Sequence, residues 1–266
     1  MKHLNLVLLI ICLAVVSCKS DSKNETSNAM ETNSKDVVAE TVSEEQQLNI
    51  HPISHATMVL TYGSDVLYVD PTGGAEAFEG YTNPKIVLIT DIHGDHYSIE
   101  TLKALDLSAS TIIAPKAVID LFPEDLKTKR NVVLDNGEMA TIDHFTFEAI
   151  PMYNLREEAL KFHPKGRGNG YVITVAGERI YISGDTEDIP EMRALEAIDK
   201  AFVCMNLPYT MTVDKAAEAV LEFKPKTVYP YHYRGTDGYS DVEKFKTLIN
   251  QGDETIEVIQ LEWYKE

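Results

Sequence analysis

The sequence has few cysteines, three in all. Cys12 and Cys18 lie close to the N-terminus, so Cys204 is the single cysteine in the body of the chain. A lone thiol has no intrachain partner, which excludes a disulfide framework there. Cys204 also has no neighbouring motif that would activate it as a nucleophile, and we expect it to be a buried core residue.

Basic residues are scarce relative to acidic ones. Lys and Arg number 24 against 42 Asp and Glu, which gives a formal net charge of −18. Sequence-independent nucleic-acid binding depends on clustered Lys and Arg, so we expect no nucleic-acid partner. Hydrophobic residues make up 44% of the chain and charged residues 25%, an ordinary globular composition that argues against disorder of the whole chain.

Long hydrophobic runs are missing except at the N-terminus, where residues 1–17 read MKHLNLVLLIICLAVVS. The apolar part is shorter than the roughly 20 residues of a membrane-spanning helix and is typical of a signal peptide. The segment VVSC, which ends at Cys18, resembles the lipobox of bacterial lipoproteins. That resemblance implies cleavage before Cys18, lipid attachment to Cys18 and export to the bacterial cell envelope, at the outer membrane or facing the periplasm. The alternatives are a plain secretory signal and an uncleaved anchor.

The segment after the signal is polar and acidic. Residues 18–47 contain no aromatic residue and bury too little apolar surface to offset their ordering entropy, so we expect a disordered tether. The remaining residues, 48–266, are compatible with one domain.

Within that domain, clusters of strands are followed by alternating strands and helices. Apolar runs and turn residues predict strands at 55–60, 66–69, 86–90, 111–114, 132–134, 141–142, 146–150, 171–175, 179–183, 200–205, 227–230 and 256–261. Helices are predicted at 98–105, with Ser98 as N-cap, and at 115–122, 189–197, 213–222 and 242–250. This pattern suggests two packed sheets with helices outside, although it also fits a generic α/β fold.

Potential metal ligands crowd into one segment behind an apolar run. The run IVLIT (residues 86–90) predicts a strand buried on both faces, and DIHGDH (residues 91–96) follows it. A short loop of this kind aims alternate imidazole and carboxylate groups into one pocket. Three further segments carry similar groups: strands that end at Asp185 and His232, and a loop that contains His163.

At these residues the chain resembles the metallo-β-lactamase-fold hydrolases, whose hallmark reads His-x-His-x-Asp-His. It is most similar to the branch that contains ascorbate-6-phosphate lactonase and the N-acyl-phosphatidylethanolamine phospholipase D enzymes. The match extends over about residues 50–235 and includes His55-Ala56-Thr57, the strand ending at Asp70, and Ser183-Gly184-Asp185-Thr186. The resemblance implies an α+β fold, a four-layer αββα sandwich.

The resemblance also implies a metal site with one or two divalent cations. His93 would bind the first cation, Asp95 and His96 the second, Asp185 would bridge them, and His232 would complete the second site. Asp91 stands where the hallmark has its first histidine. The family implies zinc, whereas the carboxylate of Asp91 favours manganese or iron. Alternatively, Asp91 weakens the first site so far that a single cation is held.

The last ligand of the first site is open between two residues. The family places a histidine after a central strand, and the candidates are His163, our choice, and Asn154. His55 and Asp70 are candidates for the pocket wall or for orienting a metal-bound histidine, with a purely structural role as the alternative for each. Lys165 and Arg167 either contact an anionic substrate or are solvated. We interpret the glycine-rich residues 166–170 as a flexible loop bordering the site, because they precede a strand and not a helix.

The chemistry implied by two such sites is hydrolysis. A metal-bound hydroxide would attack an ester, lactone, amide or phosphodiester of a small molecule, with Asp95 as ligand and orienting catalytic residue. The competing hypothesis is a non-catalytic metal-binding lipoprotein that retains the fold. The sequence leaves the substrate, the metal and the oligomeric state open, with a small homo-oligomer as our guess.

Overall fold

The computed structural model describes residues 47–264. The predicted signal peptide, Cys18 and nearly all of the predicted tether lie outside these residues. In the described part no helix is both long enough and apolar enough to cross a membrane.

A first sheet is built by the N-terminal half of the described chain. Its order is β1 (Leu48–Ser54), β2 (Thr57–Tyr62), β3 (Asp65–Val69), β4 (Ile86–Leu88), β5 (Thr111–Ala114) and β6 (Arg130–Val133). The strands from β1 to β3 are antiparallel, and those from β3 to β6 are parallel. The parallel strands β4 and β5 are fully buried, as their continuous apolar sequences predict.

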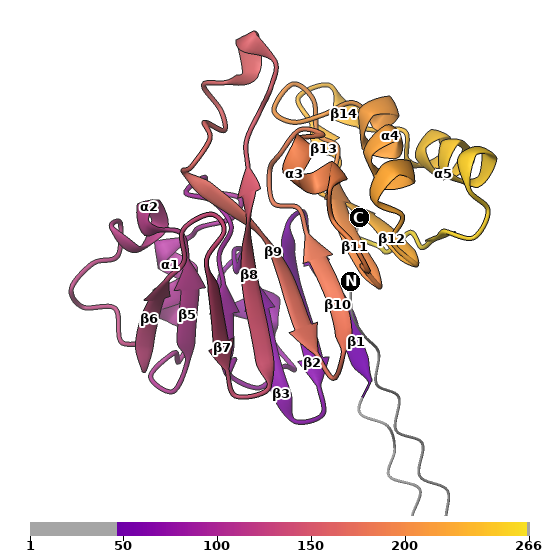
Figure 1. Cartoon of the computed structure of the whole chain (residues 1–266). Coiled ribbons are helices and arrows are strands. Elements are labelled where there is room, and N and C mark those ends of the chain that lie inside the picture. The colour runs from indigo at the N-terminus through magenta and orange to yellow at the C-terminus, as the bar shows by residue number, and fades with distance from the viewer. Residues whose placement is uncertain (1–46, 265–266) are drawn as a thin grey trace, which may run out of the picture. The chain divides into compact units, whose positions relative to one another are not determined.

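A second sheet follows with a similar plan. Its order is β15 (Glu257–Val258), β12 (Thr227–Tyr231), β11 (Lys200–Cys204), β10 (Glu178–Ile182), β9 (Gly168–Val175), β8 (Phe145–Met152) and β7 (Met139–Ile142). The strands from β7 to β10 are antiparallel, and β10, β11, β12 and β15 are parallel. A small hairpin of β13 (Arg234–Gly235) and β14 (Gly238–Tyr239) follows β12 (Figure 1).

The helices cover the outer faces of the two sheets. The first sheet carries α1 (Ile99–Ala104) and α2 (Lys116–Ile119), and the second carries α3 (Pro190–Arg193), α4 (Val213–Phe223) and α5 (Val242–Gly252), as Figure 1 shows. Short 3-10 turns lie at Ala75–Phe78 and Glu157–Ala159. The Ser98 side chain accepts a hydrogen bond from the Thr101 amide at 3.2 Å, so the predicted N-cap of α1 is confirmed.

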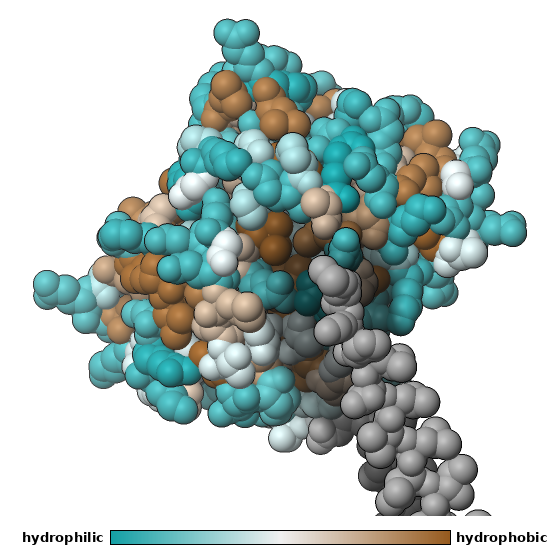
Figure 2. Space-filling view, in the orientation of Figure 1, coloured by the Kyte–Doolittle hydropathy of each residue, from teal (hydrophilic) through white to brown (hydrophobic). Residues whose placement is uncertain are grey.

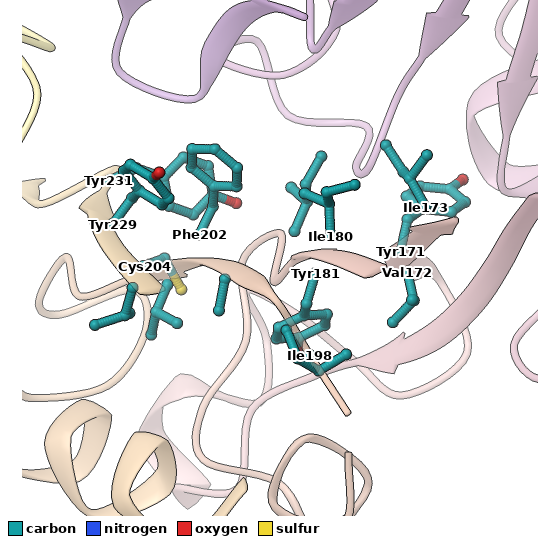
Figure 3. Close-up of a cluster of buried hydrophobic side chains, with 14 of the residues drawn as sticks. Tyr171, Val172, Ile173, Ile180, Tyr181, Ile198, Phe202, Cys204, Tyr229 and Tyr231 are labelled. Atoms are coloured by element: carbon teal, nitrogen blue, oxygen red, sulfur yellow. The ribbon is translucent and has the colours of Figure 1, made fainter. Parts of the chain in front are cut away.

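Side-chain alternation along the strands creates the layers. In β4, Ile86 and Leu88 belong to the core between the sheets, whereas Val87 packs with α1 and α2. In β10, Ile180 points toward the first sheet and Tyr181 toward the helices, where its ring meets Phe223 of α4 edge-on (Figure 3). Both apolar faces of each sheet are thereby buried. The predicted four-layer αββα sandwich is confirmed, and Cys204 is buried in its core.

Some local predictions were wrong. Residues 48–54 form β1, and the strand expected from residue 55 begins at Thr57, because His55 turns the chain with a φ of 59°. The helices expected at 115–122 and 189–197 are reduced to α2 and α3. In both cases the chain then continues with i→i+3 hydrogen bonds, such as Leu121 N–Val118 O, which belong to turns.

The glycine-rich segment is also not the flexible loop that we expected. Gly168, Asn169 and Gly170 are buried within β9. A Cβ atom on Gly170 would lie 2.8 Å from the Ser183 carbonyl oxygen and 2.9 Å from that of Ile182. The glycine therefore permits close backbone approach inside a sheet and does not provide flexibility.

We predict that Gly170→Ala destabilises the fold. The new methyl group meets backbone atoms that cannot move aside, so the free energy of unfolding should fall by about 1–3 kcal/mol. Denaturant unfolding followed by circular dichroism measures the change. Gly94→Ala is the matched control, because its Cβ meets nothing within 4 Å. Equal stability of the two variants would contradict the close-approach explanation.

Candidate metal centre

The segment between β4 and α1 brings the densest group of site residues together. The amides of His96 and Tyr97 both donate to the His93 carbonyl oxygen, at 2.9 and 2.8 Å, so the chain forms a tight turn there. This turn follows the carboxyl end of β4 in the first sheet. Asp185 and His232 follow the carboxyl ends of β10 and β12 in the second sheet. The centre thus lies where strand ends from both sheets meet.

Four side chains form what we call the second group: Asp95, His96, Asp185 and His232. His232 Nε2 lies 3.0 Å from His96 Nε2, 3.3 Å from Asp185 Oδ1 and 3.4 Å from Asp95 Oδ2. His96 Nε2 lies 3.5 Å from Asp185 Oδ2. Imidazole and carboxylate ligand atoms with this mutual spacing can hold a divalent cation.

The charged groups of the second group shift one another's pKa values. Burial by itself raises the pKa of the Asp185 carboxyl, but His232 and His96 outweigh it and hold that pKa well below its usual range. Burial lowers the pKa of His96, whereas the Asp185 and Asp70 carboxylates raise it well above its ordinary value. The carboxylates are therefore ionised, and the group attracts positive charge.

Asp70 orients His96 from behind. This fully buried carboxylate accepts hydrogen bonds from the Thr90 amide and hydroxyl, both at 2.7 Å, and its Oδ2 lies 2.8 Å from His96 Nδ1. The contact with Asp70 places the imidazole proton on Nδ1 and leaves Nε2 free for a cation. The structure thus places Asp70 where an orienting residue belongs.

Asp91, His93 and His163 form what we call the first group, next to Asp185. His93 Nδ1 lies 2.7 Å from Asp91 Oδ2. His163 Nε2 lies 3.9 Å from Asp91 Oδ2 and 3.2 Å from Asp185 Oδ2. Among the described residues, His163 Nε2 and Asp185 Oδ1 are buried and have no hydrogen-bond partner. Orphaned buried atoms of this kind fit a cation site.

The structure brings His163, and not Asn154, into this cluster. The Asn154 amide group donates to the carbonyl oxygens of Ala159, at 2.9 Å, and Tyr209, at 2.6 Å. His163 Nδ1 lies 3.2 Å from the Tyr209 carbonyl oxygen, which orients its ring. Asn154 therefore supports the loop, whereas Nε2 of His163 faces the carboxylates.

His55 lies against the second group. Its Nε2 is 3.3 Å from Asp95 Oδ2, and its ring centroid is 3.8 Å from that of His232. Its Nδ1 is 2.7 Å from the hydroxyl of Tyr264. That hydroxyl accepts hydrogen bonds from two backbone amides, so its own proton is directed to His55. The sequence pattern gave no signal for Tyr264, which reaches the centre from the C-terminal end of the described chain.

Both loop cations form ion pairs within the protein, but only Arg167 is largely buried. Lys165 Nζ lies 2.7 Å from a Glu191 carboxylate oxygen and over the ring of Tyr153. Arg167 binds both oxygens of Asp91, at 3.2 and 3.0 Å. Lys165 is 59% exposed and so fits the solvated alternative, whereas the pairing of the largely buried Arg167 with Asp91 was not predicted.

A cavity of about 340 Å³ opens onto the centre. It is lined by His93, Asp95, Phe162, His163, Asp185, Asn206 and Tyr209. The rings of Phe162 and Tyr209 meet edge-on with centroids 5.1 Å apart. The segment between β8 and β9 projects beyond the sheets (Figure 1), and apolar patches are visible at that end of the molecule (Figure 2). Leu155 and Leu160 of this segment are about half-exposed.

Two facing sheets with outer helices, and a His/Asp cluster at the strand ends of both sheets, define the metallo-β-lactamase class of fold. Residues 49–232 match the family described as beta-lactamase superfamily domain. The chain therefore belongs to the beta-lactamase superfamily, and the resemblance found in the sequence is confirmed.

Relatives and solved structures agree with this assignment. The UPF0173 metal-dependent hydrolase of Pyrococcus abyssi is 28% identical over 207 residues, which cover 74% of this chain and 90% of that protein. The UPF0173 metal-dependent hydrolase of Thermoplasma acidophilum is 31% identical, covering 62% and 73%. A crystal structure of a candidate metal-dependent hydrolase from Parabacteroides distasonis is 38% identical, with a TM-score of 0.73 and coverage of 82% and 94%. By family, the chain is a metal-dependent hydrolase.

We predict that Asp70→Asn weakens metal binding at the second group. The amide is uncharged and offers one acceptor oxygen, whereas the carboxylate is charged and offers two. His96 should therefore be oriented less firmly. Affinity should fall about 10–100-fold, as measured by competition with a chromophoric chelator. Asp120→Asn, at an exposed pair with Lys116, is the control. Unchanged affinity in a folded Asp70 variant would show that this carboxylate does not support the ligand.

Proposed function

We propose that the protein hydrolyses an ester, lactone, amide or phosphodiester of a small molecule at this centre. The observation that carries the proposal is the second group, in which side chains from both sheets converge and His96 is fixed by a buried carboxylate. A divalent cation held there would acidify a water molecule to a hydroxide nucleophile and polarise the attacked oxygen.

The chain's own residues divide the remaining tasks. Asp95 is the partly exposed member of the second group, with 42% of its side chain accessible, and it lines the cavity. It is therefore placed to orient a water molecule, while its Oδ2 is held by His55. Asp185 is buried and adds negative charge that retains the cation.

The cavity favours a substrate with an apolar portion. Phe162 and Tyr209 offer aromatic surface beside the centre, and the volume suits a small ligand or part of one. No Lys or Arg is found among the residues that line this cavity in the described chain. Substrate charge would then be met by the histidines and by the cation. The Asp91 carboxylate, at a position where the family has a histidine, supports manganese or iron as alternatives to the zinc that the family implies.

Metal removal and ligand substitution test the proposed function. The purified chain without its first 18 residues should contain Zn, Mn or Fe by elemental analysis. It should hydrolyse members of a panel of aryl esters, lactones and a bis-aryl phosphodiester, and a chelator should abolish this activity. His232→Ala should lower kcat/KM by more than about 100-fold, because a ligand is lost.

Lys165→Gln is the control for that experiment, because Lys165 pairs with Glu191 outside the group. Metal bound without turnover of any panel member would leave the non-catalytic alternative. Absence of metal after reconstitution with each cation would exclude both the hydrolase and the non-catalytic metal-binding protein.

We also propose that the protein is exported and lipid-anchored through Cys18. The signal-like residues 1–17 and the lipobox-like VVSC support this proposal. In a bacterial host fed with an alkyne-labelled fatty acid, the chain should be labelled, and Cys18→Ala should lose the label. Cys12→Ala should keep it. Equal labelling of all three proteins would contradict lipidation at Cys18.

A further inference from the structure

His93 of the first group and His96 of the second group differ in how they are held. Arg167 Nε lies 3.2 Å from Asp91 Oδ1, and one terminal nitrogen lies 3.0 Å from Asp91 Oδ2. The same terminal nitrogen lies 3.3 Å from His93 Nε2 and 2.5 Å from the Phe162 carbonyl oxygen. The guanidinium group thus sits directly on the first group.

The backbone fixes this position. The Asn169 amide donates to the Thr90 carbonyl oxygen at 3.0 Å, which ties the start of β9 to the residue before Asp91. A Cβ atom on Gly168 would lie 3.0 Å from the same oxygen and 3.3 Å from Asp91 Oδ1. The close approach that this glycine allows brings its neighbour Arg167 onto Asp91.

Hydrogen-bond accounting then opposes a cation between His93 and Asp91, whereas the unpartnered His163 Nε2 faces Asp185 of the second group. A guanidinium group has donors only, so the Arg167 nitrogen beside His93 Nε2 favours the tautomer with the imidazole proton on Nδ1, although its two hydrogens also face Asp91 Oδ2 and the Phe162 carbonyl oxygen. Nδ1 donates to Asp91 Oδ2 at 2.7 Å. Both imidazole nitrogens are therefore satisfied within the protein. A cation on Nδ1 would move the proton to Nε2, where it would face the Arg167 donor.

The second group shows the opposite arrangement. There Asp70 accepts a hydrogen bond from Nδ1 of His96, and Nε2 faces Asp185 and His232. A histidine is prepared to bind a cation through one ring nitrogen when a hydrogen-bond acceptor faces the other nitrogen. A hydrogen-bond donor at that position does not prepare it.

Charge leads to the same result. The Asp91 side chain is fully buried and that of Arg167 is 18% exposed, so their pair is shielded from solvent. The pair is neutral, and it stands where the family's hallmark has a neutral histidine. Breaking a buried ion pair is strongly destabilising, so a cation would gain Asp91 as a ligand only at that cost.

We propose that the guanidinium group of Arg167 takes the place of the first cation, so that the centre holds one cation tightly, at the second group. Arg167 is then a positioning residue, which fixes Asp91 and His93 at the cavity wall. This inference rests on the proposed function, because it assumes that the second group binds metal.

Metal stoichiometry tests the inference without an activity assay. Apoprotein titrated with Zn²⁺ or Mn²⁺ should bind about one equivalent tightly, with a second at least about 10-fold weaker. Arg167→Gln, and the double variant Asp91→His with Arg167→Gln, should strengthen the second equivalent by at least about 10-fold. Lys165→Gln, a nearby cation that pairs with Glu191, should behave as the unchanged protein. Two equivalents of similar affinity in the unchanged protein would overturn the inference.

A second measurement needs no substitution, in case a variant fails to fold. Electron paramagnetic resonance of the Mn²⁺-loaded chain should show the hyperfine pattern of isolated ions at loadings up to one equivalent. An exchange-coupled signal from a pair of ions at such a loading would overturn the inference while leaving the proposed function intact. Absence of any tight Mn²⁺ or Zn²⁺ binding would instead overturn the proposed function and the inference with it.

Discussion

The centre depends on one buried carboxylate. Asp70 directly follows β3 and accepts hydrogen bonds from the backbone and side chain of Thr90, which follows the parallel strand β4. It also holds His96. A buried carboxylate is costly unless its lone pairs are satisfied, and these donors satisfy them. The same contacts fix the relative position of two strand ends and the direction of a ligand, so fold stability and site geometry rest on one interaction.

Around this anchor the centre is asymmetric. The second group is prepared for a cation by the Asp70 carboxylate behind His96 and by the ionised Asp185 carboxylate in front of it. The first group already contains a cation of the protein's own, because Arg167 binds Asp91. Asp91 thus places a carboxylate where the family's hallmark has a neutral histidine, and the guanidinium group of Arg167 compensates its charge. Two-cation chemistry therefore cannot be transferred to this chain by family resemblance alone.

Much of the fold was predictable because its determinants are local. Continuous apolar runs marked β4, β5 and β10 as buried strands, and Ser98 marked the start of α1. The predictions failed where a local pattern had a non-local cause. Gly168 and Gly170 looked like a flexible loop, yet they lie in β9 because other backbone segments pass too close for a Cβ atom. His55 looked like a strand residue, yet it turns the chain with a positive φ.

The sequence by itself determined the chemistry of the centre. Histidines and aspartates placed directly after apolar strands lie at the carboxyl ends of their own sheet, because parallel strands present these ends on the same side. That the ends of the two sheets meet was implied by the family resemblance. Only the tertiary structure decided how these groups are paired. Arg167 meets Asp91 across 76 positions of sequence, and Tyr264 meets His55 across 209. Contacts of this kind follow from how the sheets and loops pack, and no periodicity or spacing in the chain records them.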